Sequence, residues 1–330
     1  MTPTRRVTSS DVAREAGVSR ATVSYVLNNT PRQSIPESTR QRVLAAAQEL
    51  NYTPHAAARA LRAGESNLVL FINTGVPYGV NLSVLLDTLT AEVSATGRSL
   101  VIWQQRDPAD LATTLAHLQP RLAIALGELD DTQRALLAQA RIPTVETDLG
   151  RDPVSPDVGT ALQIQHLAGH GHRRLGYLTT SQPELERFTV PRLATARSTA
   201  LELGLTRPLV YDVGPHLPEV SVDALASVLR DWTGGAEPVT AVACYNDICA
   251  AACIAAAPRA GLEIPGDLAV IGMDDETMSA FTRPALTTIR LDMISFAEHL
   301  WERTSAALEN RPEPGLFSSM SFTLVERASV

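Results

Sequence analysis

Polar side chains near the N-terminus are spaced along two short, adjacent stretches of helical periodicity. Residues 7–28 read VTSSDVAREAGVSRATVSYVLN, with apolar residues at helical spacing on both sides of Gly17. Thr8 and Asp11 form a capping-box-like start, Gly17 ends the first helix, and Ser19 caps a second helix from Arg20 to Leu27. We expect the outer face of that second helix to carry Arg20, Thr22, Ser24, Tyr25 and Asn28. Two helices joined by a short glycine turn predict a helix-turn-helix, whose second helix enters the major groove.

The charge distribution supports this interpretation. Residues 1–64 hold nine Arg and four acidic residues, a net charge of +5, whereas residues 65–330 hold nineteen Arg and thirty-two acidic residues, a net charge of −13. Every fixed cation is an arginine, because the chain contains no lysine. A small basic segment on an acidic body is typical of a local phosphate-binding surface, and it is hidden in the overall charge of −8.

A third helix and a short arginine-flanked segment follow. Pro36 fits the first turn of this helix, and its expected inward stripe is Val43, Leu44, Ala47 and Leu50. Further on, Leu61 lies between Arg59 and Arg62 in an Ala-rich segment that is too short to form a stable helix alone. An apolar side chain between cations can wedge into a base step from the minor groove, although it can equally pack on the next domain.

A second polar group follows the expected strands of the larger part. Asn246 and Asp247 come directly after the strand at 239–244, Asp274 follows the strand at 268–273, and Arg192 lies at the expected start of a helix. Ligands of open α/β sheets bind outside the carboxyl ends of the strands. A cation, an amide and a carboxylate at one crevice suit a polar small molecule, with Asp247 favoured as a cap and Asp274 as a ligand contact.

Other residues that could do chemistry lack the patterns that chemistry needs. His166, His170 and His172 have metal-like spacing, but glycines flank His170 and no Cys or carboxylate cluster joins them. The three cysteines lie in an apolar Ala-rich stretch, where free Cys behaves as a small hydrophobe. No nucleophile elbow, phosphate-binding loop or dinucleotide fingerprint occurs. We therefore expect neither an enzyme nor a cofactor or metal site.

The elements that must position these residues alternate along the chain. Nine apolar runs of strand length are expected at 68–72, 100–103, 122–126, 144–145, 175–178, 209–213, 239–244, 268–273 and 287–291. Helical stretches lie between them at 80–96, 109–118, 131–140, 159–169, 192–204, 221–231, 247–257 and 293–309. This alternation predicts an α/β fold with parallel sheets covered on both faces, and the number of strands suits two doubly wound sheets in tandem.

The N-terminal part resembles the DNA-binding head and hinge of the LacI/GalR family of transcriptional repressors. The resemblance rests on DVAREAGVSRATVSYVLN, TRQRVLAAAQELNYTP and AARALR. It implies that Arg20, Ala21 and Tyr25 read bases, that Leu61 is the hinge leucine, and that another group lies at phosphates: Thr8, Ser19, Thr22, Ser24 and Asn28. It also places His55, Ala58 and Arg59 at the DNA. Tyr25 and His55 depart from the Arg and Asn common in the family, so the operator sequence does not carry over.

The larger part is similar to the effector domain of the same family. The similarity lies in GHGHRRLGYL, in the long segment from VTAVACYNDICAAA to PALTTIR, and in the terminal LVERAS. It implies a type I periplasmic-binding-protein fold in which Arg192, Asn246 and Asp274 contact the effector. The N-terminal half departs from the family, because NTGVPYGVNLS replaces an Asn-Pro-Phe-Phe-type run and Ser155 stands near the usual acidic ligand residue.

Together these observations predict a transcriptional regulator. We expect a helix-turn-helix domain at 1–51, a hinge at 52–65, and an effector-binding and dimerisation domain at 66–330. The chain is expected to switch between the two α/β subdomains of this last domain near 156 and 283–320. The expected partners are a double-stranded, pseudo-palindromic DNA operator, a second copy in a homodimer, and a sugar or related polar metabolite. The location is the cytoplasm, with no membrane contact. Alternatives are a regulator with a degenerate pocket that acts constitutively or through a partner, a transport component, and an enzyme fused to a DNA-binding domain.

Overall fold

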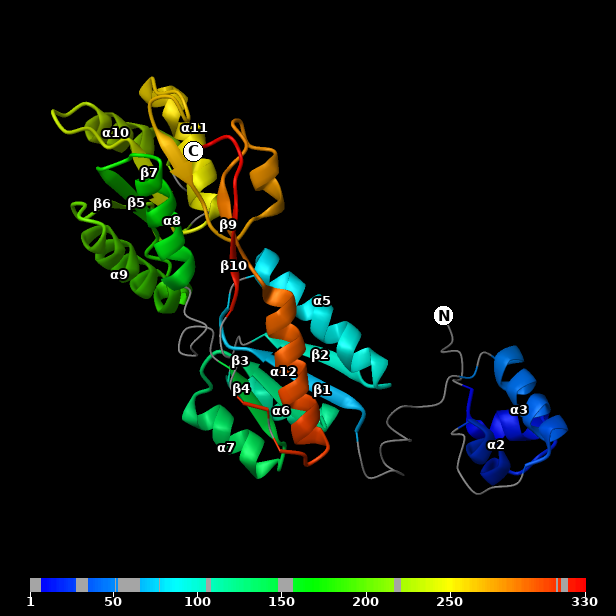
Figure 1. Cartoon of the computed structure of the whole chain (residues 1–330). Coiled ribbons are helices and arrows are strands. Elements are labelled where there is room, and N and C mark those ends of the chain that lie inside the picture. Colours follow the sequence, from blue (N-terminus) through cyan, green and yellow to red (C-terminus); the bar gives the residue numbers. More distant parts are fainter. Residues whose placement is uncertain are drawn as a thin grey trace. The chain divides into compact units, whose positions relative to one another are not determined.

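The computed structural model divides the chain into two compact units, Met1–Ser66 and Asn67–Val330 (Figure 1). The ranges that it describes are 7–27, 35–50, 52, 66–76, 78–104, 108–147, 157–216, 221–312, 314–315 and 320–330.

The described residues of the smaller unit form three short helices, α1 (Ser9–Glu15), α2 (Arg20–Leu27) and α3 (Glu37–Glu49). The Asp11 carboxylate accepts hydrogen bonds from the backbone N–H and the hydroxyl of Thr8, which fixes the start of α1. Gly17 has a φ of +64°, a left-handed conformation that glycine adopts without strain, and it makes the turn between α1 and α2. Ser19 Oγ accepts a hydrogen bond from the backbone N–H of Thr22, so the predicted cap of α2 is confirmed.

One stripe from each of these helices forms the core of the smaller unit. Its buried side chains are Val12, Ala13, Ala16, Val23, Val26, Val43, Ala46 and Ala47. Two expectations for α3 are wrong: Pro36 precedes the helix as its N-cap residue, and Leu44 is 48% exposed. The buried positions 43, 46 and 47 and the partly buried position 50 follow a spacing of three and four residues, which turns Leu44 away from the core.

The N-terminal half of the larger unit is a four-stranded parallel sheet in the order β2-β1-β3-β4. Its strands are β1 (Leu68–Asn73), β2 (Ser99–Gln104), β3 (Leu122–Leu126) and β4 (Thr144–Thr147). Successive residues of β1 alternate between two cores. Val69 and Phe71 pack with α5 (Val80–Ala95) and α12 (Met293–Leu308), whereas Leu70 and Ile72 pack with α6 (Pro108–Leu118) and α7 (Asp131–Gln139). Helices therefore cover both faces of this sheet (Figure 1).

The C-terminal half repeats this architecture with a sheet in the order β6-β5-β7-β8. Its strands are β5 (Leu175–Thr179), β6 (Leu209–Asp212), β7 (Ala241–Cys244) and β8 (Ala269–Ile271). One face packs on α8 (Asp157–Gly169) and α9 (Glu186–Glu202), and the other on α10 (Val222–Thr233) and α11 (Asp247–Ala260). The expected pair of doubly wound parallel sheets is confirmed.

Two antiparallel strands, β9 (Thr288–Leu291) and β10 (Phe322–Val325), connect the two halves (Figure 1). β9 leads from the C-terminal half into α12, and β10 returns the chain to the C-terminal half, where the amide of Val270 donates to the carbonyl of Ser329. Sequence analysis predicted β9 but missed β10. β10 has only four residues, none of them fully buried, and Thr323 interrupts its apolar residues.

The expected helix at 192–204 starts too late, because α9 begins at Glu186. Arg192 is therefore in the second turn of α9 and not at its start. Pro191 lies inside the helix, where its missing N–H removes one backbone hydrogen bond without ending the helix. A 3-10 turn at Pro183–Leu185 leads directly into α9.

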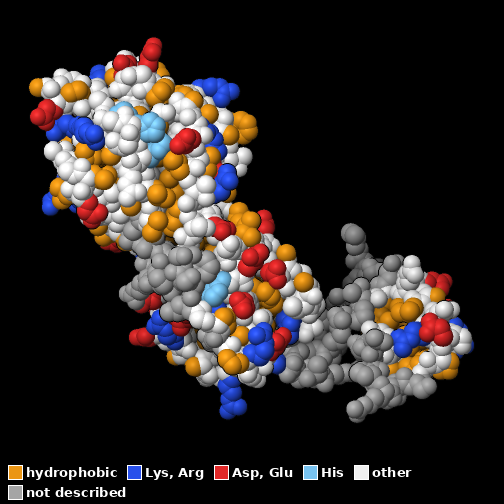
Figure 2. All heavy atoms as spheres, viewed as in Figure 1, with side chains coloured by type: hydrophobic (Ala, Val, Ile, Leu, Met, Phe, Trp, Pro, Cys, Tyr) orange, Lys and Arg blue, Asp and Glu red, His pale blue; other side chains and the backbone are white. Residues whose placement is uncertain are grey.

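Charges are mixed on the visible surface of the larger unit. Figure 2 shows acidic, basic and apolar side chains interspersed on that face, without one large area of a single sign. A phosphate-binding surface is not evident there, in keeping with the negative net charge of residues 65–330.

Candidate functional site

The exposed face of α2 carries the side chains that sequence analysis assigned to DNA. Arg20, Ala21 and Tyr25 are exposed, and Thr22 and Ser24 are partly exposed, whereas Val23 and Val26 are buried on the opposite face. Thr8 and Ser19, at the starts of α1 and α2, are also exposed. The rigid three-helix core thus presents hydroxyl, phenol and guanidinium groups on one side, as base and phosphate contacts require.

A second candidate site lies in the larger unit, where the carboxyl ends of the two parallel sheets face each other. Three hydrogen bonds join residues that follow strands of the N-terminal half to residues of the C-terminal half. Asn81 Nδ2 donates to Asp274 Oδ1 (3.1 Å), the amide of Val80 donates to Glu276 Oε1 (3.1 Å), and Arg187 donates to the carbonyl of Thr74 (3.4 Å). Ligands of this sheet type bind at that edge of the strands, so this cleft is the candidate effector site.

Arg192 and Asp274 form the charged centre of the cleft. Arg192 Nη2 lies 3.6 Å from Asp274 Oδ1, and Arg192 Nη1 donates to the carbonyl of Tyr245 (2.8 Å). The guanidinium also lies 4.7 Å from the centroid of the Tyr245 ring, within the range of a cation–π contact. Only 6% of the Arg192 side chain and 19% of the Asp274 side chain are exposed. The pair is thus desolvated and still open to a small ligand on the Asp274 side.

Burial and ion pairing shift the pKa of each of these two groups in opposite directions. Burial raises the pKa of Asp274, and the nearby Arg192 guanidinium opposes that shift. A carboxylate on the rim of a low-dielectric site binds hydroxyl donors strongly, whereas the Tyr245 ring is buried and packs against Arg192. Carboxylate, amide and guanidinium groups together suit a polyhydroxylated or similarly polar molecule.

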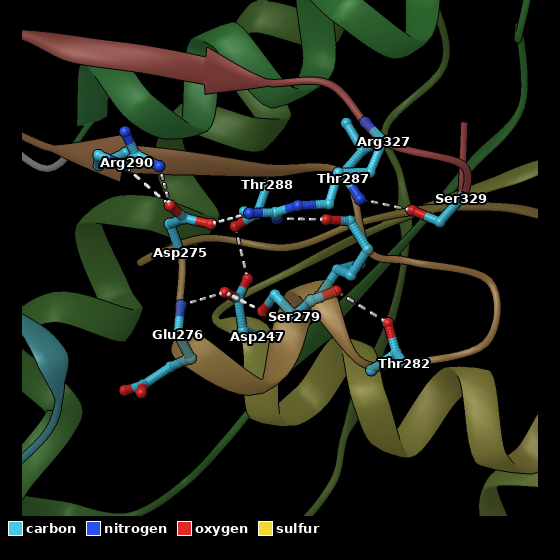
Figure 3. Close-up of polar contacts among 11 residues, drawn as sticks. Asp247, Asp275, Glu276, Ser279, Thr282, Thr287, Thr288, Arg290, Arg327 and Ser329 are labelled. Carbon is cyan, nitrogen blue, oxygen red and sulfur yellow. Dashed lines mark hydrogen bonds and ion pairs between the residues drawn. The ribbon is translucent and has the colours of Figure 1, made fainter.

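Asn246 and Asp247 have separate local roles. Asn246 Oδ1 accepts a hydrogen bond from the amide of Cys249, so Asn246 caps α11. Asp247 is fully buried, and its carboxylate accepts hydrogen bonds from Ser279 Oγ, Thr288 Oγ1 and the amide of Glu276 (Figure 3). Burial raises the pKa of Asp247 to about 7, although these three donors oppose the shift. Sequence analysis favoured Asp247 as a cap, but its neighbour Asn246 is the cap.

A hollow of about 580 Å³ adjoins the cleft. It lies between the loop after β1 and the start of α9, and it is lined by Thr74, Gly75, Pro183, Glu184, Glu186, Arg187, Val190 and Pro191. Its wall therefore comes from both halves of the larger unit, as expected of a site that responds to their relative position.

The cysteines and histidines set aside in the sequence have simple surroundings. Cys244, Cys249 and Cys253 are buried free thiols, and burial raises the pKa of Cys249 and Cys253 to about 12. The rings of His166 and His170 lie 4.3 Å apart, and burial lowers the pKa of His166. Among the described residues, no group of three or more His, Cys, Asp or Glu side chains is arranged to hold a metal ion.

Both units match known protein families. Residues 8–55 match the family described as "Bacterial regulatory proteins, lacI family", and residues 164–330 match the "Periplasmic binding protein-like domain". The transcriptional regulator GalR of Escherichia coli is 30% identical over 335 residues, which cover 98% of this chain and 95% of GalR. The chain belongs to the lacI family of bacterial regulatory proteins. This lacI-family chain is also 30% identical to the transcriptional repressor PurR of Klebsiella pneumoniae over 339 residues, covering 98% of this chain and 96% of PurR.

Solved structures show the same fold. The lac repressor dimer bound to operator and the anti-inducer ONPF superimposes with a TM-score of 0.78 at 23% identity, covering 98% of this chain and 99% of the other. A complex of the regulator CelR with cellobiose gives a TM-score of 0.63 at 24% identity, covering 98% of this chain and all of the other. The lacI-family chain is thus a DNA-binding transcriptional regulator with a periplasmic-binding-protein-like domain, and it is not an enzyme. None of the helices in its described ranges is long and apolar enough to cross a membrane.

Some expected site residues lie outside the described ranges, and some observed ones were not expected. Asn28, His55, Ala58, Arg59, Leu61 and Ser155 fall outside those ranges. Sequence analysis missed Asn81, Tyr245 and Glu276 as cleft residues. Tyr245 directly follows the buried strand β7, a position that marks the carboxyl edge of the sheet, whereas Asn81 and Glu276 reach the cleft only through contacts between distant segments.

Proposed function

We propose that this regulator is a repressor that binds a pseudo-palindromic operator as a homodimer and responds to a sugar or related polar metabolite in its cleft. The observation that carries the effector assignment is the buried Arg192–Asp274 pair at the facing ends of the two sheets. The protein would act in the cytoplasm, where its DNA partner lies.

In this proposal, Arg20, Ala21 and Tyr25 contact base edges, and a second group contacts phosphates: Thr8, Ser19, Thr22, Ser24 and Asn28. The exposure of the described members supports these roles. The proposal extends to His55, Ala58 and Arg59 at the DNA and to Leu61 as a minor-groove wedge. We also propose the division into a DNA-binding domain at 1–51, a hinge at 52–65 and an effector domain at 66–330.

Exposed apolar side chains on two segments of the C-terminal half would support the homodimer. Ile248, Met278 and Phe281 are 39%, 40% and 71% exposed, and the hydrogen bond between Asp247 and Ser279 holds their two segments together. Large exposed apolar side chains that gather on one face are typical of interaction surfaces. We propose that this face belongs to the dimer interface, where twofold symmetry would match a pseudo-palindromic operator.

The effector assignment is a class of molecule and not one compound. The cleft combines the Asp274 carboxylate with the amides of Asn81 and Asn246, which supply hydrogen-bonding groups for a sugar. Arg192, Asn246 and Asp274 are the proposed effector contacts, and the structural relative CelR was solved with cellobiose. A pocket that no longer binds a ligand is the competing interpretation, because Asn81 already occupies one oxygen of Asp274.

Titration of operator binding tests this proposal. Fluorescence anisotropy of labelled operator DNA, selected from genomic fragments, would be followed while hexoses, pentoses, disaccharides including cellobiose, and sugar phosphates are added. We expect at least one of these sugars to change operator affinity in the parent and not in Asp274→Asn. Asp223→Asn, which removes an exposed ion pair with Arg259, is the matched control. Failure of every sugar to alter operator binding would reject the sugar class and favour the degenerate pocket.

A further inference from the structure

The loop that follows β8 holds two consecutive residues in the left-handed backbone region. Asp274 has a φ of +100° and Asp275 a φ of +52°. Residues that carry a Cβ rarely adopt this conformation, and they keep it only where the surroundings hold them. Contacts outside the loop must therefore maintain the backbone that directs Asp274 into the cleft.

Asp275 provides the strongest of these contacts. Its Oδ2 accepts hydrogen bonds from Arg290 Nε (2.8 Å) and Nη2 (2.5 Å), and its Oδ1 accepts one from Arg327 Nη2 (2.6 Å), as Figure 3 shows. Only 8% of the Asp275 side chain is exposed. Burial alone would raise the pKa of Asp275, but the hydrogen bonds from Arg327 and Arg290 outweigh it and lower the pKa. Asp275 therefore stays ionised and held from two sides.

Both arginines belong to the segments that connect the halves of the larger unit. Arg290 lies in β9, where it pairs with Thr323 of β10, and Arg327 lies two residues after β10. Arg327 is fixed further, because its Nη1 donates to the carbonyl of Leu286 (2.7 Å) and its amide donates to Thr287 Oγ1 (3.0 Å). One carboxylate is thus bonded to both of the crossings that lie in the described ranges, at β9 and after β10.

The residues on either side of Asp275 reach the cleft and the crossings as well. The amide of Asp274 donates to the carbonyl of Ile289 in β9 (2.8 Å), while its carboxylate faces Arg192. The amide of Glu276 donates to Asp247 (2.7 Å), and its carboxylate accepts from the amide of Val80 in the N-terminal half. Movement of β9 and β10 relative to the sheets would therefore displace the loop that carries Asp274.

We propose that Asp275 is a positioning residue that couples the cleft to the crossover strands through Arg290 and Arg327. Its ion pairs hold Asp274 in place. They also transmit a conformational change at the cleft to β9 and β10, an inference that rests on the proposed effector function. A ligand shifts a conformational equilibrium only through contacts that differ between the two states, and the ion pairs of Asp275 connect the cleft loop to β9 and to the segment after β10. Arg327, 19% exposed, contributes more than Arg290, 59% exposed, because solvent weakens the outer pair.

Hydrogen–deuterium exchange on the full chain without ligand tests the positioning role. In Asp275→Asn, the amides of Asp274 and Glu276 and those of β9 and β10 should exchange about tenfold faster or more than in the parent, since a hydrogen bond to a charged group is worth at least that factor. Exchange in β1 should stay within about twofold, which separates a local effect from global destabilisation. Arg327→Gln should reproduce the pattern, Arg290→Gln should show a weaker form, and Asp223→Asn should show none.

Two exchange results would overturn the proposal. One is exchange of the loop and of β9 and β10 in Asp275→Asn that matches the parent. The other is acceleration in every segment including β1, which would mean that Asp275 supports overall stability alone.

Coupling is read separately from operator titrations with the same sugar panel. Without sugar, the operator affinity of Asp275→Asn should stay within about twofold of the parent. The active sugar should change operator affinity much less in Asp275→Asn, so that the ratio of affinities with and without sugar is smaller by about tenfold or more. A ratio that is unchanged would overturn the coupling role. A panel with no active sugar would reject the proposed effector class, while the exchange rates would still decide whether Asp275 holds the loop.

Discussion

Asp274 and Asp275 are neighbours in the chain, yet their carboxylates contact different partners of the loop after β8. Asp274 Oδ1 lies 3.6 Å from Arg192 in the cleft, whereas Asp275 Oδ1 lies 2.6 Å from Arg327 beside the crossover strands. Under the proposed function, Asp274 contacts the effector and Asp275 holds the loop to the crossover strands.

The division predicts a selective defect in Asp274→Asn. Removing one charged hydrogen bond to a desolvated ligand costs about 1.5–3 kcal/mol, so effector affinity should fall by about tenfold to more than a hundredfold. Affinity for operator without effector should change by less than about twofold, because the cleft lies in the larger unit and the proposed base-reading face lies in the smaller one. Isothermal titration with the active sugar and anisotropy with operator measure the two quantities. A variant that binds the sugar like the parent would remove Asp274 from the site.

A pH dependence of stability is expected from Asp247. Burial raises its pKa from the ordinary 3.8 to about 7, so the folded chain binds a proton that the unfolded chain has released in this window. The free energy of unfolding should therefore decrease as pH rises from about 4 to about 7, by up to about 4 kcal/mol, and stay constant above. Asp247→Asn should lack this decrease, since an amide does not titrate and can still accept from Ser279 and from the amide of Glu276. Urea unfolding of the parent and of the variant at several pH values gives the comparison, and parallel curves would contradict it.

Arg20→Ala should weaken operator binding more than binding to random DNA. Arg20 is exposed at the start of α2, and one good contact to a base edge is worth about 1–3 kcal/mol of discrimination. Operator affinity should fall by about tenfold to a hundredfold, while affinity for random DNA should fall less. Arg42→Ala, on the exposed side of α3, is the control for charge alone. Equal losses on both DNAs, or equal losses for the two variants, would mean that Arg20 contributes only charge.

The proposed dimer face predicts that Phe281→Asp dissociates the protein. The side chain is 71% exposed, so the change should cost little folding stability, but it places a charge in an apolar interface. Light scattering should show a shift from dimer to monomer, together with loss of operator affinity because two half-sites are no longer linked. Leu201→Asp, at an exposed position of α9, is the control that should remain dimeric. A Phe281→Asp protein that stays dimeric would place the interface elsewhere.

Local patterns in the sequence predicted most of the fold. Gly17 and the Ser19 cap delimit the helices of the head, and alternating strands and helices give the two sheets, because each signal lies within a few residues of what it specifies. Leu44 was misplaced because two registers of one helical stripe look alike in a short helix. The strand β10 escaped notice because its pairing with β9 spans a long stretch of chain and leaves no buried run.

The candidate site was predictable only in part. Arg192 and Asp274 could be expected near the same edge, since Asp274 follows β8 and Arg192 lies near the start of α9, the helix after β5. The roles of Asn81 and Asp275 depend on partners 193 and 52 residues away, and no local spacing records such contacts. Asn246 and Asp247 show the converse difficulty, because two adjacent polar residues gave no sign of which one caps α11 and which one is buried.

DNase footprinting on the selected operator tests the central claim most directly. The account predicts protection of a pseudo-palindrome with two half-sites about one helical turn apart or a multiple of it, by a protein dimer, with affinity that falls steeply with salt. Addition of the active sugar should change the protection in the parent and leave it unaltered in Asp274→Asn. Protection of a single asymmetric half-site by a monomer, unaffected by any sugar, would contradict the account.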